Sequence, residues 1–423
     1  EYTGQIINSL NWLGLQWSEP LLFQSKRTNN YKNAIHKLLD SGIAYRCFLT
    51  KEELDQSRKE AQTKGGDFRV PKTYRDIPLQ DQKRMLNAGQ SFTIRLKISP
   101  GNTLFKDHIY GDITVNNEEI DDFIIARSDG TPTYNFTVVV DDYDMGISHV
   151  IRGEDHISNT PKQLLIYEAL GYPAPEFAHL PMILGPDKKR LSKRHGAAGI
   201  QEFRDAGYAA DALLNYLVML GWNPGTEQEL FTREEMVTQF TIRKVQKKGA
   251  VYDEKKLHWI AGQHLARFSE NELLQSIRSE EPNWQRHAKD EYIHPILKLM
   301  KIRAKTFNEL KDISDYFFSD PVTFDQEAAA KRWKDKSLNK LIENYIQRLE
   351  NIANWSAADL EAVLRATAED MAVSAAKLIH PVRLAVSGKS EGPGLFELLE
   401  LLGKMTCIRR LRKALTIFPL TND

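Results

Sequence analysis

The sequence predicts an α/β protein whose first half contains a parallel sheet and whose second half is helical. Three observations support this fold class. Strand and helix patterns alternate between residues 122 and 184, and strand patterns nearly vanish after Asp205. The chain has 423 residues, and because hydrophobic cores rarely grow beyond roughly 250–300 residues, we expect two or three domains.

Composition argues against several classes of protein. Hydrophobic residues make up 41% of the chain, and no apolar run approaches the roughly 20 residues that a membrane-spanning helix needs. Lys plus Arg and Asp plus Glu each number 57, so a polyanionic partner would have to bind a local basic surface. The two cysteines, Cys47 and Cys407, fit neither a disulfide framework nor a zinc-ligand spacing, and therefore favour the cytoplasm as the compartment.

The first elements follow from the spacing of apolar residues. Helical spacing predicts two helices, over about residues 6–13 and 31–39. Alternation of apolar and polar residues predicts a half-buried strand over 92–98, and a further strand is expected over 122–127. The run over 134–140 is rich in β-branched and aromatic residues and predicts a strand buried on both faces.

The segment that follows predicts a parallel crossover. A short strand over 149–151 leads into a polar loop, and Ser158 and Asn159 can cap a helix that carries Pro161 in its first turn. A strand over 179–184 comes next. Strand, loop, helix and strand in this order are typical of two parallel strands joined by a helix.

Three polar residues are expected at the ligand-binding edge of this sheet. Open parallel sheets bind ligands beyond the carboxyl ends of their strands. Asp142, Arg152 and Glu154 each follow or end a predicted strand. We therefore predict that these three side chains lie at a binding site.

The most informative segment is the basic loop GPDKKRLSKRHG at residues 185–196. Gly and Pro permit a tight exposed turn, and five cations gather at the mouth of the sheet. Nucleotidyl transfer needs such cations because negative charge builds on phosphate oxygens in the transition state. Charge alone favours a solvated loop or a nucleic-acid contact instead, so the order and spacing of the residues must decide.

The order of these residues resembles a known signature. RLSKR at 190–194 resembles the KMSKS element of class I aminoacyl-tRNA synthetases, in the form typical of bacterial-type glutamyl-tRNA synthetases. The resemblance extends over essentially the whole chain, and in chain order it includes NWLGL at 11–15, QSKR at 24–27, DGTPTYNF at 129–136, VVDD at 139–142, VIRGEDH at 150–156, NTP at 159–161, LNYL at 214–217, LGW at 220–222 and KLHW at 256–259. On this ordered set the chain is identified as a member of that family.

The resemblance implies a two-step reaction. Glutamate attacks the α-phosphate of ATP to give glutamyl-adenylate and pyrophosphate, and the terminal ribose hydroxyl of tRNA then takes the acyl group. No side chain need be a covalent nucleophile, so catalysis rests on positioning and charge stabilisation. The implied partners are ATP with Mg²⁺, L-glutamate and glutamate tRNA, and whether glutamine tRNA is also charged stays open. The enzyme is expected to be a cytoplasmic monomer.

The resemblance also implies a nucleotide site. Lys193 is the second lysine of the signature and is expected to bind ATP phosphates, while Ser192 and Arg194 shape the loop as the other catalytic residues. Arg190 stands where the family usually has lysine, which leaves its ATP contact less secure because a guanidinium and an ammonium differ in geometry. The remaining expected ATP neighbours are Ile183, Glu154, Asp155 and His156, and Leu191 completes the signature. His156 is otherwise read as a residue at the start of a helix.

A glutamate pocket is implied by three further residues. Arg152 is expected to bind a substrate carboxylate, Tyr134 to supply a hydroxyl, and Asp142 to orient the pocket. The alternative is structural, because Arg152 could pair with Asp142 or Glu154 to hold loops, and Tyr134 alone would more often be a core aromatic residue. The motif match favours the binding role.

Two departures from the family pattern stand out. The HIGH-type segment that contributes to the ATP site is absent, so the chain is expected to be truncated at its N-terminus, with an incomplete sheet, and inactive as written. Some relatives carry zinc ligands in the inserted domain, but Cys47 has no neighbouring partner. Since tetrahedral zinc needs about four ligands, no structural zinc is expected, and Cys47 and Cys407 are expected to be ordinary apolar residues.

The family pattern divides the chain into four parts. A Rossmann-type catalytic domain is expected over 1–45 and 129–185, an inserted acceptor-stem-binding α/β domain over 46–128, a stem-contact region over 186–262, and an α-helical anticodon-binding region over 263–423. A basic run near the end of the chain comprises Arg409, Arg410, Arg412 and Lys413. It could contact the tRNA backbone, but a solvated helix face is the favoured reading of any charge run.

Two other functions remain open at this stage. A paralogue that glutamylates a tRNA base is disfavoured, because it lacks an anticodon-binding domain and this chain has roughly 160 residues after the catalytic part. A non-catalytic tRNA-binding fragment or pseudoenzyme is kept open by the missing start. The sequence favours glutamate–tRNA ligase over both.

Overall fold

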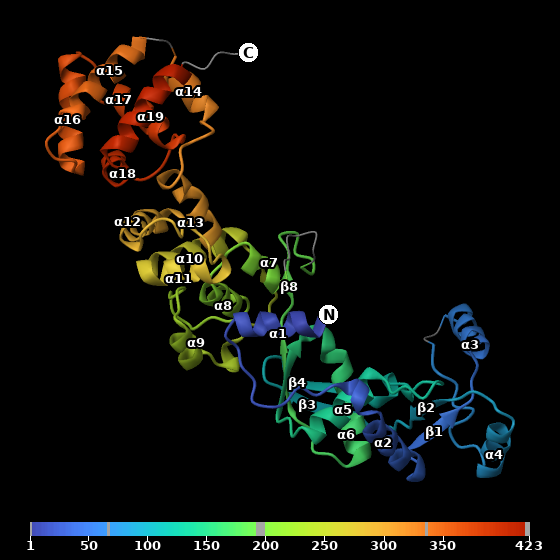
Figure 1. The fold of residues 1–423 in the computed structure, drawn as a ribbon. Coiled ribbons are helices and arrows are strands. Elements are labelled where there is room, and N and C mark those ends of the chain that lie inside the picture. Colours follow the sequence, from blue (N-terminus) through green and yellow to red (C-terminus); the bar gives the residue numbers. More distant parts are fainter. Residues whose placement is uncertain (1, 66–67, 192–198, 335–336, 419–423) are drawn as a thin grey trace.

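The computed structural model describes residues 2–65, 68–191, 199–334 and 337–418. Figure 1 shows an elongated molecule in which helices α3 and α4 lie at one end and the helices from α14 to α19 at the other. The first part of the chain holds nearly all the strands, whereas the part after residue 252 is helical. The predicted change from α/β to all-α structure is confirmed. Among the described residues, no helix is both long and apolar enough to cross a membrane.

The chain opens with two helices and an antiparallel sheet. The expected helices are α1 (Tyr2–Trp12) and α2 (Thr28–Asp40). The sheet has the strand order β1-β2-β5, and the helices α3 and α4 lie between β1 and β2 in the chain. The bounds are β1 (Ala44–Cys47), α3 (Lys51–Thr63), α4 (Leu79–Asn87), β2 (Thr93–Leu96) and β5 (Ile124–Ala126). Cys47 is buried in β1.

A second sheet, of order β4-β3-β7-β6, carries the predicted crossover. Strands β6 and β7 are parallel and are joined through α6, as the sequence predicts. Strands β3 and β4 form an antiparallel hairpin, and β3 joins β7 in parallel at Asp107 and Phe177. The bounds are β3 (Asn102–Asp107), β4 (Gly111–Asn116), β6 (His149–Gly153), the 3-10 helix η3 (Glu154–Asn159), α6 (Thr160–Leu170) and β7 (Glu176–Leu180).

The strand expected over 179–184 is interrupted. Strand β7 ends at Leu180, and a separate strand β8 (Ile183–Leu184) pairs in parallel with β9 (Ala250–Val251). Residues before the basic loop therefore leave the crossover sheet and pair with a segment near the helical part.

The strand expected over 134–140 is wrong, because this run forms helix α5 (Tyr134–Asp144). Phe136, Val139 and Val140 are buried and lie at positions i, i+3 and i+4, which is the spacing of one helix face. Packing of that face outweighs the strand preference of β-branched residues. Asp142 consequently lies on a helix rather than at the end of a strand, which corrects its expected placement.

Helix α6 differs from expectation only at its start. Asn159 precedes the helix, but its side-chain nitrogen lies 3.2 Å from Nδ1 of His156 and does not cap the helix. Pro161 occupies the first turn, as predicted. Gly171 ends the helix in the left-handed region with φ 69°, a conformation that glycine adopts at little cost.

The remaining part of the chain is mostly helical: α7 and α8 pack with part of α10 in a smaller apolar cluster, and the helices that follow share one large apolar core. That core runs from Leu265 on α10 to Phe418 after α19. Cys407 lies within it and is fully buried, in agreement with its expected apolar role. The bounds are α7 (Ile200–Asp205), α8 (Ala210–Met219), α9 (Arg233–Gln239), α10 (Glu254–Arg267), α11 (Glu270–Glu280), α12 (Asp290–Met300), α13 (Phe307–Ser314), α14 (Gln326–Arg332), α15 (Ser337–Glu350), α16 (Ala357–Asp370), α17 (Ala376–Ser387), α18 (Leu395–Leu402) and α19 (Lys404–Ile417).

The basic run on α19 contains one cation that is structural. Arg410 is 4% exposed, and its guanidinium donates to the carbonyl oxygens of Tyr316, Ser319 and Val386. Its Nε lies 2.8 Å from Asp320 Oδ1. Arg409 also pairs with Asp320, and the two cations hold the pKa of that carboxyl below its usual value. The side chain of Arg410 is therefore neither a tRNA contact nor part of a solvated face.

We predict that Arg410→Ala lowers the stability of the protein by about 3–5 kcal/mol, because it leaves buried carbonyl groups and Asp320 without their donor. Urea unfolding followed by circular dichroism measures this change. Arg412→Ala is the matched control, since Arg412 is 63% exposed and pairs with Glu350 at the surface, and it should cost at most about 1 kcal/mol. Equal midpoints for the two variants would contradict the structural role of Arg410.

Candidate functional site

The candidate site is centred on Arg152, near the carboxyl end of β6. Its backbone is aligned with His179 of β7 in the parallel pairing of the two strands. The guanidinium is partly buried: Nε donates to His179 Nε2 at 3.2 Å, and one terminal nitrogen donates to Thr160 Oγ1 at 2.8 Å. The group also lies over the ring of Phe177, 5.6 Å from its centre. Arg152 is thus fixed by neutral partners.

The charge of Arg152 is not neutralised by a carboxylate. Within the described parts of the chain, no salt bridge of 4.0 Å or less joins it to Asp142, Glu154 or another acid. Burial lowers the pKa of Arg152, while the Tyr134 hydroxyl and the Asp142 carboxylate nearby act in the opposite direction. The structural alternative, in which Arg152 is one half of an ion pair, is therefore not what the structure contains. A partly buried cation with spare donors is suited to an incoming anion.

Asp142 and Tyr134 lie on the helix that faces Arg152. The carboxylate of Asp142 accepts a hydrogen bond from the Tyr167 hydroxyl at 3.2 Å. Burial raises the pKa of Asp142, and Tyr167 and Arg152 counteract this effect. Tyr134 begins α5, is 49% exposed and has its ring 5.9 Å from that of His156. Tyr134 is accordingly a surface residue beside the site and not a core aromatic residue.

A buried carboxylate–imidazole pair supports Arg152 from behind, and sequence reasoning missed it. His179 and Asp107 are 0% and 1% exposed, and His179 Nδ1 lies 2.6 Å from Asp107 Oδ2. The other ring nitrogen, Nε2, meets the Nε of Arg152 and the hydroxyl of Thr160, 3.1 Å away. Because Arg152 can only donate, Nε2 must accept, which places the single proton of a neutral imidazole on Nδ1. The pair was hidden because its residues lie 72 positions apart.

The pKa of each partner is shifted in a direction that fits this arrangement. Burial lowers the pKa of His179 and the Arg152 cation adds to this, although Asp107 opposes it. Burial acts to raise the pKa of Asp107, but hydrogen bonds from the backbone of Tyr110, from His179 and from the backbone of Ile109 outweigh burial and hold that pKa below its usual value. A neutral histidine and an ionised aspartate are therefore the stable forms near neutral pH.

The expected ATP neighbours lie around η3 and β8, and several are already engaged. Glu154 accepts hydrogen bonds from the Tyr110 hydroxyl and, at 2.9 Å, from the backbone N–H of Met182. Asp155 Oδ2 lies 3.4 Å from a terminal nitrogen of Arg190. Glu154 therefore ties three segments together, whereas Asp155 and Arg190 are accessible at the surface.

The described part of the basic loop is a tight hairpin. The backbone N–H of Gly185 donates to the Lys189 carbonyl at 2.8 Å, and that of Leu191 donates to the Ile183 carbonyl at 2.9 Å. Lys188 adopts a left-handed conformation with φ 61° at the turn. The three expected catalytic residues, Ser192, Lys193 and Arg194, lie outside the described residues. The hairpin brings the chain back beside Ile183 immediately before them.

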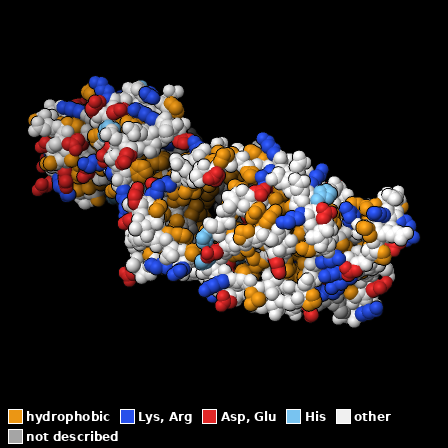
Figure 2. Space-filling model, turned by 90° about the horizontal axis from the view of Figure 1, so that it is seen from below, with side chains coloured by type: hydrophobic (Ala, Val, Ile, Leu, Met, Phe, Trp, Pro, Cys, Tyr) orange, Lys and Arg blue, Asp and Glu red, His pale blue; other side chains and the backbone are white. Residues whose placement is uncertain are grey.

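Charge on the face seen in Figure 2 is mixed rather than segregated. Figure 2 shows one face of the molecule, on which Lys and Arg side chains are interspersed with Asp and Glu over most of its length. Apolar side chains gather toward the middle of the same face. This pattern agrees with the equal numbers of acidic and basic residues in the chain.

Comparison with known proteins finds relatives that match nearly the whole chain. Residues 1–259 match the model for the catalytic domain of class I tRNA synthetases for glutamate and glutamine, and residues 264–415 match an anticodon-binding domain. A glutamate–tRNA ligase of Syntrophomonas wolfei is 43% identical over 97% of this chain and 85% of its own length, and one of Caldicellulosiruptor saccharolyticus is 41% identical over 98% and 88%. The crystal structure of a glutamate–tRNA ligase from Elizabethkingia meningosepticum, in complex with its amino acid, superimposes with a TM-score of 0.87 at 30% identity and covers 98% of this chain and 89% of that one.

We predict that acidification loosens the site through His179. Its folded pKa lies below the ordinary histidine value of 6.5, so the folded state binds fewer protons than the unfolded state and stability is lost as pH falls below that value, by at most about 1.4 kcal/mol per pH unit. Asp107 adds a loss in the same direction, but only below its ordinary value of 3.8. In His179→Gln, whose side chain has both a donor and an acceptor but does not titrate, the apparent Tm should fall less between about pH 7.5 and about pH 5.5.

The control is His36→Gln, which changes an exposed histidine on α2. It should keep the pH dependence of the unaltered protein. An unchanged slope in His179→Gln would show that His179 does not titrate in this window.

Proposed function

Because this chain belongs to the family of class I tRNA synthetases for glutamate and glutamine, we propose that it is a glutamate–tRNA ligase. The enzyme activates L-glutamate with ATP to form glutamyl-adenylate and then transfers the glutamyl group to the 3′ end of glutamate tRNA. The relatives that carry this name match 97–98% of the chain. The observation that carries the proposal is the guanidinium of Arg152, which is partly buried and lacks a carboxylate partner among the described residues.

Arg152 binds a carboxylate of glutamate in this proposal. The guanidinium is held by Thr160 and His179, so its orientation is set before the substrate arrives, which reduces the entropy lost on binding. Tyr134 supplies a hydroxyl at the exposed side of the pocket. Asp142 helps to orient the pocket, and its negative charge favours the charged form of Arg152. His179 and Asp107 act through Arg152 and are therefore positioning residues.

Adenylation needs the nucleotide to lie near η3, which carries Asp155 and His156 and where Asp155 meets Arg190. The adenosine would lie beside Ile183, and its phosphates would face the basic loop that continues into Lys193. ATP arrives with Mg²⁺, which neutralises phosphate charge. The chain contributes cations that stabilise the negative charge on the α-phosphate as pyrophosphate leaves.

The tRNA would be held by parts of the chain beyond this pocket. We assign residues 1–45 and 129–185 to the catalytic domain, 46–128 to acceptor-stem binding, 186–262 to stem contact and 263–423 to anticodon binding. The match of residues 264–415 to an anticodon-binding domain supports the last assignment. Strands from residues 46–128 belong to both sheets. The part of the chain that binds the acceptor stem would therefore share a sheet with the strands that carry Arg152 and His179. The proposed enzyme works as a cytoplasmic monomer.

We predict that the protein catalyses ATP–pyrophosphate exchange that depends on glutamate, and that Lys193→Ala slows this exchange by about 10²–10³-fold, as loss of a charge-stabilising donor does elsewhere. The matched control is Lys189→Ala, an exposed lysine four residues earlier on the same loop, which should keep most of the rate. Exchange supported by another amino acid but not by glutamate would refute the proposed function, and an unaffected Lys193→Ala would refute the role of that lysine.

We also predict that Arg152→Lys raises the dissociation constant for L-glutamate by about 10–100-fold, because a point charge replaces a planar fork that can form two charge-assisted hydrogen bonds. Isothermal titration of the purified protein measures the change directly. Arg84→Lys, on the exposed surface of α4 with a side chain 77% accessible, is the control. Equal affinities in the two variants would exclude Arg152 from the glutamate pocket.

A further inference from the structure

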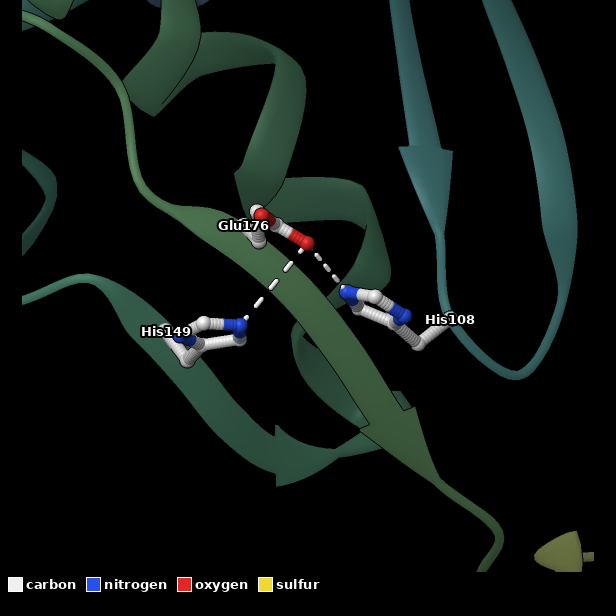
Figure 3. Close-up of side chains that lie close together, drawn as sticks. All are labelled: His108, His149 and Glu176. Carbon is white, nitrogen blue, oxygen red and sulfur yellow. Dashed lines mark hydrogen bonds and ion pairs between the residues drawn. The ribbon is translucent and has the colours of Figure 1, made fainter. Parts of the chain in front are cut away.

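Two histidines and a glutamate converge at the edge of the crossover sheet, away from the proposed catalytic pocket. His108 lies in the turn between β3 and β4, His149 begins β6, and Glu176 begins β7. Figure 3 shows the three side chains directed toward one another. Glu176 Oε2 lies 2.6 Å from His108 Nε2 and 3.7 Å from His149 Nε2, and all three ligand atoms lie within 4.8 Å of one another.

We propose that His108, His149 and Glu176 form a binding site for one divalent transition-metal cation of the zinc type. Imidazole nitrogens select zinc, copper or nickel over magnesium and calcium, which prefer oxygen ligands alone. Two histidines and one carboxylate leave the fourth position of a tetrahedral ion to water. The earlier expectation that the chain has no zinc site rested on cysteine spacing, so it did not consider this donor set.

The geometry allows an ion to enter with small side-chain movements. Zinc binds nitrogen and oxygen at about 2.0–2.1 Å, so ligand atoms around it lie roughly 3.3 Å apart. The carboxylate would move away from His108 and toward His149. Glu176 is 61% exposed and His149 is 52% exposed, so both side chains have room to adjust.

The ring of His149 is already oriented for binding through Nε2. Its Nδ1 lies 3.0 Å from the hydroxyl of Ser148, which can accept the Nδ1 proton. Ligating histidines generally donate their second nitrogen to such a partner, which fixes the tautomer. The rings of His108 and His149 are also nearly parallel, with centres 5.9 Å apart.

A simple ion pair does not account for all three residues. Ion pairs of Glu176 with His108 and His149 at the surface would contribute little, since such pairs are worth about 0–1 kcal/mol each, and they do not require two histidines to share one carboxylate oxygen. The three residues come from three separate segments that meet where β3 joins β7, a seam formed by the pairing of Asp107 with Phe177 and the bond from the His108 N–H to the Phe177 carbonyl. A bound cation would clamp this seam.

The site is separate from the nucleotide pocket. His149 and Arg152 lie at opposite ends of β6, and three residues along a strand bring their side chains to opposite faces. The cation would therefore not be the magnesium ion that accompanies ATP. It would instead hold the turn that follows Asp107, the residue that hydrogen-bonds to His179.

The test is zinc binding to the purified full chain after removal of metals with a chelator. The unaltered protein should bind Zn²⁺ at this site, with a Tm that rises on addition of zinc. In the double variant His108→Ala and His149→Ala, one equivalent of Zn²⁺ per chain should be lost, or its dissociation constant should rise at least 100-fold. Glu176→Gln should raise the constant by about 10–100-fold.

The matched control is the double variant His36→Ala and His287→Ala, which removes two exposed histidines elsewhere. It should bind zinc as the unaltered protein does. Cobalt provides a second readout, because Co²⁺ in a tetrahedral nitrogen–oxygen site acquires visible absorption that the cluster variant should lack. No saturable zinc binding by the unaltered protein, or equal binding by the cluster variant, would overturn the proposal.

Discussion

The hydrogen bond between Asp107 and His179 is the interaction on which the rest of the site depends. Asp107 shapes the turn after β3 by accepting from the backbone N–H groups of Ile109 and Tyr110, and its second oxygen fixes the imidazole of His179. His179 in turn presents a lone pair to Arg152. Because both partners are buried, a change in either leaves an uncompensated polar group in the core. Three strands and the guanidinium of Arg152 are thereby linked through one carboxylate.

A second buried carboxylate, Asp141, sets the position of helix α5. It accepts hydrogen bonds from Gln24 and Arg27 and from the hydroxyl of Tyr31, and burial together with Asp141 raises the pKa of Tyr31 to about 12. The residues before and within α2 are thus attached to the helix that carries Tyr134 and Asp142. This gives a structural reason for the Gln-Ser-Lys-Arg motif, which in the sequence was only one of several matches.

Two arginines show how the surroundings of a charge separate structure from binding. Arg410 has its donors taken by an aspartate and three carbonyl groups, so little binding capacity remains. Arg152 is held by a histidine, a hydroxyl and an aromatic face, none of which neutralises it within the described chain. A cation that is held in position but not paired can still form charge-assisted hydrogen bonds with an anionic ligand. The residue type is the same, and although Arg410 is the more buried of the two, the partners decide which guanidinium is left without a carboxylate.

The sequence by itself determined the two opening helices, the parallel crossover, the change from α/β to helical structure, and the family. Periodicity and ordered motifs are local properties, so the crossover through β6, α6 and β7 and the basic turn after β8 could be predicted. Only the tertiary structure decided that residues 134–140 are helical, because one face of that run packs into a core made by distant segments. It also decided which polar groups meet: Asp107 with His179, and His108 and His149 with Glu176. Such pairs depend on strand register across long separations, which no local pattern in one sequence specifies.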